Sequence, residues 1–197
     1  MKSDQEYYQK KFLDTDLTKQ TLTKAIFDNC TFKHCQFDDA VLEKCKFIDC
    51  SFIDCSLNLT KLNGSSFQET QFRNCKMKGI NWTQISYPNI VIDSPVFFYN
   101  CDVSYSSFFE LNLSNISFSQ CRLHEVDFRN ANLSNADLSE SDLLGAQFSK
   151  SNLSNADFRD ATNYQINPVE NNVAKAHFSY PDVIGLLKSF NISIEEC

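Results

Sequence analysis

Residues 131–140 read Ala131-Asn132-Leu133-Ser134-Asn135 and then Ala136-Asp137-Leu138-Ser139-Glu140. Each group of five places a small residue two positions before a large apolar residue, and its other three positions are polar. A spacing of five matches neither the helical period of about 3.6 residues nor the strand period of about two. A chain that turns a corner in every group of five explains the pattern better than any single secondary structure.

This spacing extends through most of the chain. Large apolar residues recur every fifth position in two series, which are Phe12, Leu17, Leu22, Phe27, Phe32, Phe37, Leu42, Phe47, Phe52, Leu57, Leu62, Phe67, Phe72, Met77 and Trp82, and then Phe98, Val103, Phe108, Leu113, Phe118, Leu123, Phe128, Leu133, Leu138, Leu143, Phe148, Leu153 and Phe158. The position two residues earlier is mostly Ala, Cys or Ser. We therefore expect one large and one small side chain of each unit to point inward, and the other three to face water.

Residue identity also repeats at 20. The clearest examples form the expected core ladder, Phe32, Phe52 and Phe72 in the first half and Phe108, Phe128 and Phe148 in the second. Four units per coil predict a tube of square cross-section in which like residues stack. Strand spacing sets the rise at about 4.8 Å per coil, so about seven coils give a rod of roughly 35 Å.

The two units quoted first fit the A(D/N)LXX pattern, and over roughly residues 10–163 the chain resembles the pentapeptide-repeat proteins. That resemblance implies an all-β fold, the right-handed quadrilateral β-helix of a pentapeptide-repeat solenoid. We divide the chain into an N-terminal cap (1–11), N-terminal β-helix coils (12–92), a register break (93–98), acidic C-terminal coils (99–163), and a C-terminal cap and dimerisation helix (164–197).

The two series of apolar residues are out of step by one residue between Trp82 and Phe98. Tyr87-Pro88 and Ser94-Pro95 fit a bulge or kink there, because proline cannot donate to a strand ladder. We expect a one-residue slip without an inserted loop. It is either a corner adjustment or a small bump that contacts a partner.

The tail predicts a short α-helix. Pro181 suits a first helical turn, and the apolar side chains after it form one face. The end of a solenoid needs a cap, so the helix either caps the monomer or also joins two copies in a homodimer. The residues expected at such a dimer contact are Phe178, Val183, Ile184, Leu186, Leu187 and Phe190.

Cysteines and histidines show no catalytic or metal-binding pattern. Eight of the nine cysteines fall at the small inward position, and only Cys197 does not. Stacked Cβ vectors run parallel, which disfavours disulfides and tetrahedral metal ligation, so we expect buried free thiols and no cofactor or metal. His34, His124 and His177 lack a partner set for catalysis, and we expect no enzyme activity.

Charge is distributed unevenly. The net charge is −7, and residues 1–92 hold 12 basic and 11 acidic residues, whereas residues 93–163 hold 4 basic and 10 acidic residues. An acidic surface would repel nucleic acid and attract a basic partner, although solubility alone could explain it. The expected acidic face consists of Asp102, Glu110, Glu125, Asp127, Asp137, Glu140, Asp142, Asp157 and Asp160. The start of the chain lacks an apolar secretory signal, and no apolar run is long enough to span a membrane, so we expect a cytoplasmic protein that does not bind membranes.

A narrower resemblance is to the albicidin-resistance, microcin B17 immunity and Qnr-type proteins. It rests on three stretches, which are Cys75-Lys76-Met77-Lys78-Gly79-Ile80-Asn81-Trp82-Thr83, Asp160-Ala161-Thr162-Asn163-Tyr164-Gln165-Ile166-Asn167-Pro168, and the tail from Ala176 to Glu195. The resemblance implies a dimeric rod that imitates DNA, binds DNA gyrase, protects it from a toxin or drug, and in some members inhibits it. We expect no projecting loop of the kind that Qnr proteins use in quinolone protection. Protection from a peptide-like toxin therefore fits this sequence better than quinolone resistance. The alternative is a generic protein-interaction scaffold unrelated to gyrase.

Overall fold

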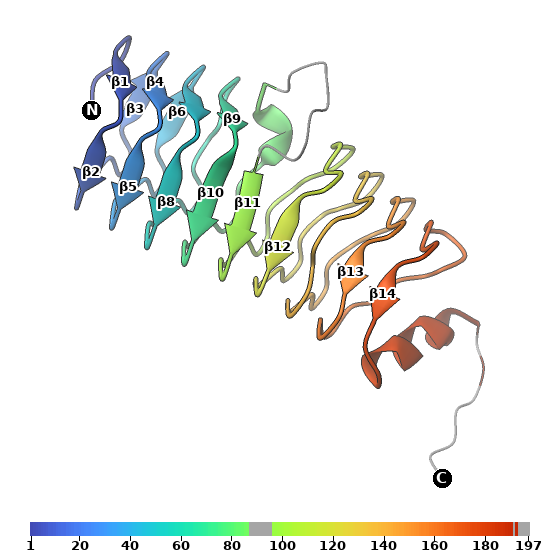
Figure 1. The fold of residues 1–197 in the computed structure, drawn as a ribbon. Coiled ribbons are helices and arrows are strands. Elements are labelled where there is room, and N and C mark those ends of the chain that lie inside the picture. Colours follow the sequence, from blue (N-terminus) through green and yellow to red (C-terminus); the bar gives the residue numbers. More distant parts are fainter. Residues whose placement is uncertain (87–95, 191, 193–197) are drawn as a thin grey trace.

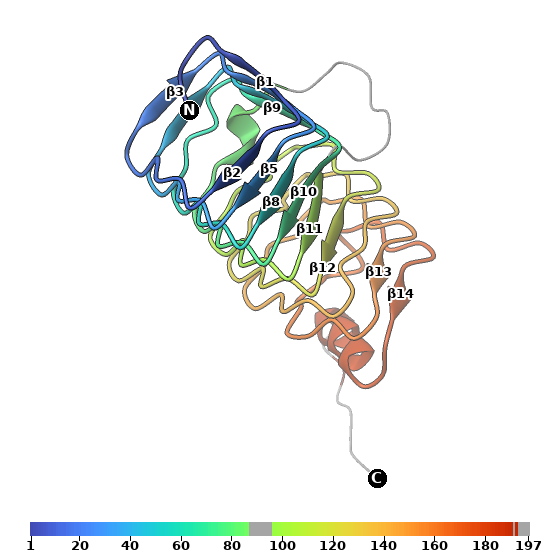
Figure 2. The same cartoon turned by 60° about the vertical axis from the view of Figure 1, so that its left-hand side comes forward.

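The structure is a computed structural model that describes residues 1–86, 96–190 and 192. The chain winds into one parallel β-solenoid of about eight turns, with the N-terminus at one end of the rod and a short helix at the other (Figures 1 and 2). Among the described residues, no helix is long and apolar enough to cross a membrane.

Each turn has four faces, which we label A to D in the order in which the chain visits them from Lys11 onward. Face A contains β2 (Lys11–Leu13), β5 (Thr31–Lys33), β8 (Ser51–Ile53), β10 (Thr70–Arg73), β11 (Val96–Tyr99), β12 (Ser117–Ser119), β13 (Asp157–Phe158) and β14 (His177–Phe178). Face B is held by single parallel bridges, from Asp16↔Gln36 to Asp142↔Thr162. Face C contains β3 (Thr21–Thr23), β6 (Val41–Glu43) and the short 3-10 helix η1 (Trp82–Gln84), and face D contains β1 (Glu6–Tyr8), β4 (Ile26–Asp28), β7 (Lys46–Ile48) and β9 (Ser66–Gln68).

The corners explain why the chain turns after every unit. The residue two positions after the large inward residue adopts a left-handed backbone, with φ of 57° at Asp39, 59° at Asn130 and 57° at Asn135. Asn and Asp tolerate this conformation better than most residues. Glycine occupies such a corner at Gly79, where a Cβ atom would lie 2.7 Å from Cδ2 of Leu59. The residue at this corner position therefore determines the turn of the backbone as well as facing solvent.

Inward side chains form continuous columns, as the spacing of five predicts. On face A, Phe32 and Phe52 stack with ring centroids 4.4 Å apart, and Phe52 and Phe72 with centroids 4.8 Å apart. On face C, Phe108, Phe128 and Phe148 continue the stack at 5.4 Å per step. The predicted core ladder is confirmed, because all six of these phenylalanines are buried. Stacked rings of this kind add about 0.5–1.5 kcal/mol per pair to the energy of burial.

One coil, which we call the wide coil, contains six more residues than the others. Phe72 on β10 pairs with Phe98 on β11, which is 26 residues later, whereas most other coils advance by 20. Ser86 still hydrogen-bonds to Ser65 in the regular register, so the six extra residues fall between Ser86 and Val96. The expected one-residue slip without an insertion is therefore wrong. Six extra residues shift a five-residue repeat by only one position, so the sequence pattern shows a slip of one residue. The predicted bulge at Tyr87-Pro88 and Ser94-Pro95 lies outside the described residues.

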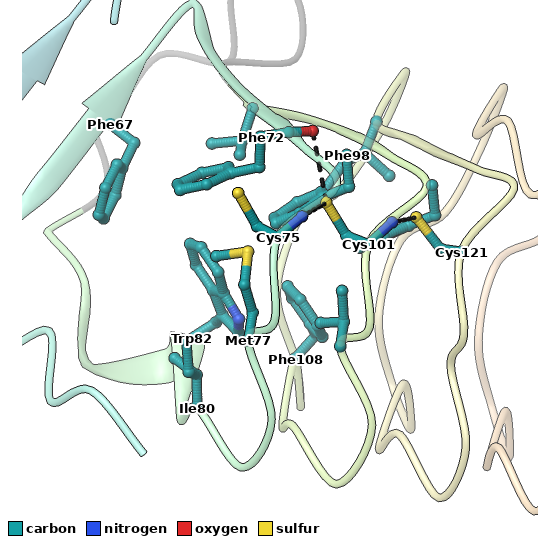
Figure 3. Packing of buried hydrophobic residues seen from close by; sticks show 14 of the residues in the cluster. Phe67, Phe72, Cys75, Met77, Ile80, Trp82, Phe98, Cys101, Phe108 and Cys121 are labelled. Carbon is teal, nitrogen blue, oxygen red and sulfur yellow. Dashed lines mark hydrogen bonds between the residues drawn. The ribbon is translucent and has the colours of Figure 1, made fainter. Parts of the chain in front are cut away.

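The wide coil keeps the core continuous. Phe72 stacks on Phe98 with ring centroids 5.3 Å apart, and Trp82 stacks on Phe108 at 5.5 Å (Figure 3). The cysteines of face B form one column across it, Cys35, Cys55, Cys75, Cys101 and Cys121, although 26 residues rather than 20 separate Cys75 from Cys101. Backbone N–H groups of Cys75 and Cys101 donate to the next sulfur in this column. All eight described cysteines are buried free thiols.

Both ends of the rod differ from the expected boundaries. At the start, β1 pairs with β4, so the coil already includes Tyr7 in the segment expected to be a cap. At the far end, β14 pairs with β13 through Phe158 and Phe178, so the solenoid continues past residue 163. The segment Asp182–Phe190 forms a 3-10 helix, η2, where an α-helix was predicted. Apolar periodicity indicates which side of a helix is buried but does not distinguish tight from ordinary coiling.

Candidate partner-binding surface

In most units of the second half, the side chain just before the large inward residue stabilises the backbone that follows. Oδ1 of Asp137 accepts a hydrogen bond from the backbone N–H of Ser139, and Oδ1 of Asn132 accepts the same bond from Ser134. The pattern recurs at Asp157 and at Asn152. A short side-chain acceptor here stabilises the corner that follows. Aspartate and asparagine perform this role equally well, so the charge at this position is a separate feature of the sequence.

The predicted acidic face is divided among three faces of the rod. Four of the nine carboxylates lie on face A or its corner with face B: Asp137, Glu140, Asp157 and Asp160. Three belong to face B and its following corner: Asp102, Glu125 and Asp142. Glu110 and Asp127 belong to face C, across the rod from face A. A single ladder of nine is therefore wrong, because successive units turn by a quarter of a coil. The seven residues on the adjacent faces A and B form what we call the acidic ridge.

Several of these carboxylates are paired with arginine. Arg129 donates to Asp127 through Nε at 2.9 Å and through Nη2 at 2.8 Å, and Arg159 contacts Asp157 in the same way, with Nε at 3.0 Å. The side-chain hydrogen bonds from these guanidinium groups lower the pKa of Asp127 and of Asp157. Both carboxylates are therefore ionised at neutral pH, but their charge is largely balanced by a neighbour two residues away.

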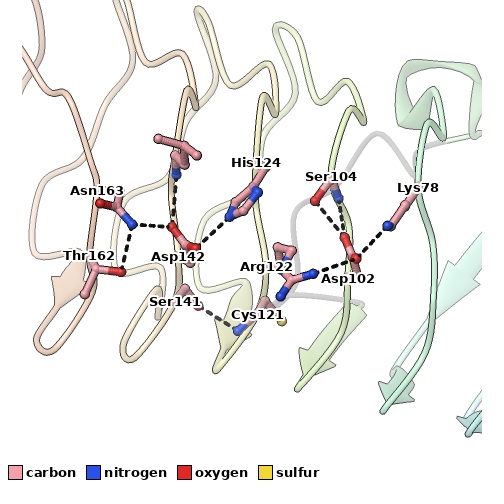
Figure 4. A network of polar contacts seen from close by, with 11 residues as sticks. Lys78, Asp102, Ser104, Cys121, Arg122, His124, Ser141, Asp142, Thr162 and Asn163 are labelled. Atoms are coloured by element: carbon pink, nitrogen blue, oxygen red, sulfur yellow. Dashed lines mark hydrogen bonds and ion pairs between the residues drawn. The ribbon is translucent and has the colours of Figure 1, made fainter.

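Face B holds a second network (Figure 4). Burial opposes the charge on Asp102, but hydrogen bonds from Ser104 and Lys78 outweigh it and lower the pKa of this carboxyl. Lys78 Nζ lies 3.1 Å and Arg122 Nη1 3.7 Å from Asp102 Oδ2. Burial likewise opposes the charge on Asp142, but Asn163 and His124 hold its pKa down, with His124 Nε2 2.6 Å from the carboxylate. Asp102 and Asp142 therefore help to stabilise the surface as well as charging it.

Three members of the acidic ridge on face A remain as open negative charges. Asp137 accepts hydrogen bonds from Ser117 and Ser139, and Glu140 accepts one from Gln120. Neither residue, nor Asp160, has an ion pair within the described part of the chain. Asp137 also stacks directly in register with Asp157. Like charges at this spacing repel, so this part of the ridge reduces stability.

Face D of the same coils carries no carboxylate within the described residues. Its outward line is Asn112, Asn132, Asn152 and Asn172, and Nδ2 of each of the last three donates to Oδ1 of the asparagine in the preceding coil at 2.9 Å. Each Oδ1 also accepts a backbone N–H two residues later, as between Asn132 and Ser134. Such an asparagine ladder satisfies its own amides and stabilises the stack. Face D is therefore a neutral, self-bonded surface.

Two outward aromatic residues were missed by the sequence interpretation. Phe97 and Tyr99 flank the inward Phe98 on β11 and are 38% and 42% exposed. The guanidinium carbon of Arg73 lies 5.7 Å from the centroid of the Tyr99 ring. The signal was present, because Val96-Phe97-Phe98-Tyr99 is a run of four large apolar or aromatic residues, longer than the apolar runs of the other units in the two series.

The predicted dimer residues separate into two groups. Phe178 belongs to β14 rather than to the helix, and its ring stacks on Phe158 with centroids 5.1 Å apart. On η2, Val183, Ile184 and Leu186 are half-buried, whereas Leu187 and Phe190 are exposed. A pocket of about 310 Å³ lies between η2 and the rod, lined by Asn163, Tyr164, Pro181, Asp182 and Gly185. Burial raises the pKa of Tyr164 there to about 12.

Metal ligation is not favoured by the geometry. Within the described residues, no group of three or more His, Cys, Asp or Glu side chains is placed to hold an ion. His34 lies at a corner, with Nδ1 3.5 Å from Asp14 and Nε2 3.4 Å from Asp54, so opposite edges of its ring face the two carboxylates.

Comparison with known proteins agrees with this geometry. A family model described as a pentapeptide repeat region matches residues 25–94 and 94–167. A solved structure of a trypsin-treated variant of QnrB1, a plasmid-mediated fluoroquinolone resistance protein, is 18% identical, with a TM-score of 0.74 and full coverage of both chains. Full-length QnrB1 is 16% identical, with a TM-score of 0.65, 95% of this chain and 100% of that chain being covered. The predicted right-handed quadrilateral form matches these structures. A search of curated protein sequences found no match.

Proposed function

We propose, from the premise that this chain belongs to the pentapeptide-repeat family, that it is a non-catalytic rod that binds DNA gyrase and protects it from a gyrase-targeting toxin or drug. The likeness to QnrB1 is one support for this proposal, and the narrower sequence resemblance to albicidin-resistance and microcin B17 immunity proteins is another. In this proposal the protein works in the cytoplasm, beside the chromosome.

The distribution of aspartate and asparagine is the observation that carries the proposal. In the last coils the residue before the large inward side chain is Asn on face D and Asp at positions 137, 142 and 157 on faces A and B. Both residues make the same corner hydrogen bond, and Asn can also form a ladder, which Asp cannot do without repulsion. At Asp137, which stacks on Asp157 and has no ion pair among the described residues, the ridge thus retains a charge where an asparagine would avoid repulsion. Such a costly charge is typical of a binding surface.

The spacing of the ridge fits a partner that normally holds DNA. Three coils of the rod span about 15 Å, a length over which duplex DNA carries about nine charges. The carboxylates of faces A and B provide a partial copy of that charge on one side of a stiff rod. A basic groove shaped for a duplex would be attracted to faces A and B and not to face D.

A homodimer is part of the proposal. Leu187 and Phe190 remain exposed on η2 at the acidic end of the rod, where a second copy could cover them. Joining two rods at this end would place both acidic ridges at the centre of the dimer, which lengthens the charged surface. The dimer is tested by its concentration dependence in analytical ultracentrifugation, with Leu187→Ser and Phe190→Ser expected to shift the species to monomer.

The function is tested by gyrase supercoiling and cleavage assays with albicidin, microcin B17 and a fluoroquinolone in parallel. We expect the protein to reduce cleavage complexes with at least one of these agents. Direct binding to gyrase is measured alongside, as a function of salt. An unchanged level of cleavage complexes with all three agents, together with no binding, would favour the scaffold alternative and end the proposal.

A matched pair of variants isolates the charge. Asp137→Asn, Glu140→Gln, Asp157→Asn and Asp160→Asn remove four charges but keep the size of each side chain and an amide oxygen that can accept a hydrogen bond. We expect about tenfold or greater loss of gyrase affinity and a flatter salt dependence. The control makes the same changes at Asp28, Asp39, Glu43 and Asp49 in the first half, and should bind as tightly as the natural sequence or more tightly.

A further inference from the structure

Face A changes character along the rod. Its outward side chains include Lys11, Lys33 and Arg73 in the first coils, then Phe97 and Tyr99 on β11, and then the carboxylates of Asp137 and Asp157. The parallel register aligns Gln71, Phe97, Ser117, Asp137 and Asp157 in a single line. The two aromatic rings therefore lie on the same flat surface as the acidic ridge.

Packing within the chain does not require these two rings. Phe97 lies in register between Gln71 and Ser117, and Tyr99 lies between Arg73 and Ser119. Most other coils place polar or small residues at the same outward positions and form the same ladder, and the exceptions, Leu13 and Ile53, are aliphatic and each stands alone on its strand. Single exposed apolar residues are common on protein surfaces, but two aromatic rings on one strand beside a charged patch are typical of an interface.

The distance between the rings and the charges is set by the solenoid. Asp137 is two strands from Phe97 and Asp157 is three, which places these carboxylates about 10 and about 15 Å from the aromatic pair. The side chains between them are Ser117 and Ser119, which are small. A partner can therefore lie flat across the serines and reach both features.

We infer that Phe97 and Tyr99 are the apolar anchor of the partner interface on face A. The inference rests on the proposed function and deepens it. The partner surface should present an aliphatic or aromatic side chain to the two rings, and a lysine or arginine side chain about 10 Å away to Asp137, which has no ion pair among the described residues. Aromatic anchors supply most of the affinity in many interfaces, whereas surrounding charges accelerate encounter and fix orientation.

The two contributions are separable by kinetics. The double variant Phe97→Thr and Tyr99→Thr removes the rings and introduces β-branched threonines, which also favour the strand conformation. We expect gyrase to dissociate from it about tenfold faster, with little change in association rate or in the salt dependence of binding. The acidic variants should instead slow association and flatten the salt dependence. Surface plasmon resonance at several salt concentrations measures all of these quantities.

Tyr8→Thr provides the matched control, because Tyr8 is 62% exposed but lies on face D at the other end of the rod. It should not change the dissociation rate. If the natural sequence binds gyrase and the double variant, with an unchanged melting temperature, dissociates at the same rate, the anchor is refuted while the proposed function stands. If the natural sequence does not bind gyrase, the proposed function fails and the anchor fails with it.

Discussion

The first and second halves of the rod share one backbone but differ in both core and surface. In the first coils, stacked phenylalanines face buried cysteines, and the outward charge of residues 1–92 is nearly balanced. In the last coils, leucine and alanine fill more of the core, while residues 93–163 hold 10 acidic and 4 basic residues. The repeat thus fixes the size of the inward residues and leaves the charge of the outward ones free. Function is to be sought outside the core.

Thiol reactivity should show the largest difference along the rod. Burial raises the pKa of the Cys50 thiol to about 12, and every described cysteine is buried. In a Cys197→Ser background, we expect Ellman's reagent at about pH 8 to react with the native protein about a thousandfold more slowly than with the unfolded chain. Because terminal coils open first, Cys30 and Cys35 should react before Cys75 and Cys101. Mass spectrometry of partially labelled protein would identify the order, and uniform labelling would contradict it.

Removing core side chains compares the two halves directly. Phe52→Ala in the first half should cost about 3–5 kcal/mol of unfolding free energy. Leu138→Ala in the second half should cost about 1 kcal/mol less, because Phe52 also loses its stacking on Phe32 and Phe72. Urea unfolding followed by circular dichroism measures both values. The outward variant Ser51→Ala should change stability by less than about 0.5 kcal/mol.

The asparagine ladder should stabilise only the second half. Asn132→Ala removes amide bonds to Asn112 and Asn152 and the corner bond to Ser134. We expect a loss of about 1–2 kcal/mol, because each hydrogen bond contributes about 0.5–1.5 kcal/mol and these bonds are partly exposed. Lys46→Ala, at the equivalent outward line of face D in the first half, should have almost no effect in the same urea experiment. Equal effects at the two positions would show that the ladder is not stabilising.

Sensitivity to acid should differ least between the two halves of the rod. Arg129 and Arg159 lower the pKa values of Asp127 and Asp157 below that of the unfolded chain. Their stabilisation is therefore present above about pH 4 and is lost as the pH falls through the folded pKa values. Asp127→Asn with Asp157→Asn should flatten the decline of Tm below about pH 4 by about 2 °C. Asp28→Asn with Asp49→Asn in the first half should leave the decline unchanged.

The columns of the core were predictable from the sequence, whereas the grouping of surface residues was not. Stepping by five from Phe12 or Phe98 finds the inward residues, because each unit has the same backbone and packing demands one size. The carboxylates were assigned to one ladder because they share a position within the unit. The face on which each carboxylate lies depends on which quarter of the coil its unit occupies. Assigning that quarter in the second half requires knowing how many residues the wide coil contains. A period of five cannot reveal a whole additional unit, so only one of the six extra residues was visible.

Local side-chain chemistry accounts for the other differences between the predictions from the sequence and the structure. Phe97 and Tyr99 break the alternation of polar and apolar residues, but a run of aromatics also reads as core. The type of helix at Asp182–Phe190 depends on how it packs against the last coil, and no pattern of apolar residues encodes that. The ion pairs of Asp127 and Asp157 could have been anticipated, since an arginine follows each of them two residues later.

The wide coil shows that the repeat can accept six additional residues without a break in the core. Phe72 and Phe98 meet as closely as rings in regular coils, although six further residues separate them. The stacks of the described coils on either side therefore stay in phase although one coil holds six more residues than its neighbours. Peptide epitopes or tags grafted between Ser86 and Val96 should leave folding intact, so this position is suited to engineered and to evolutionary insertions.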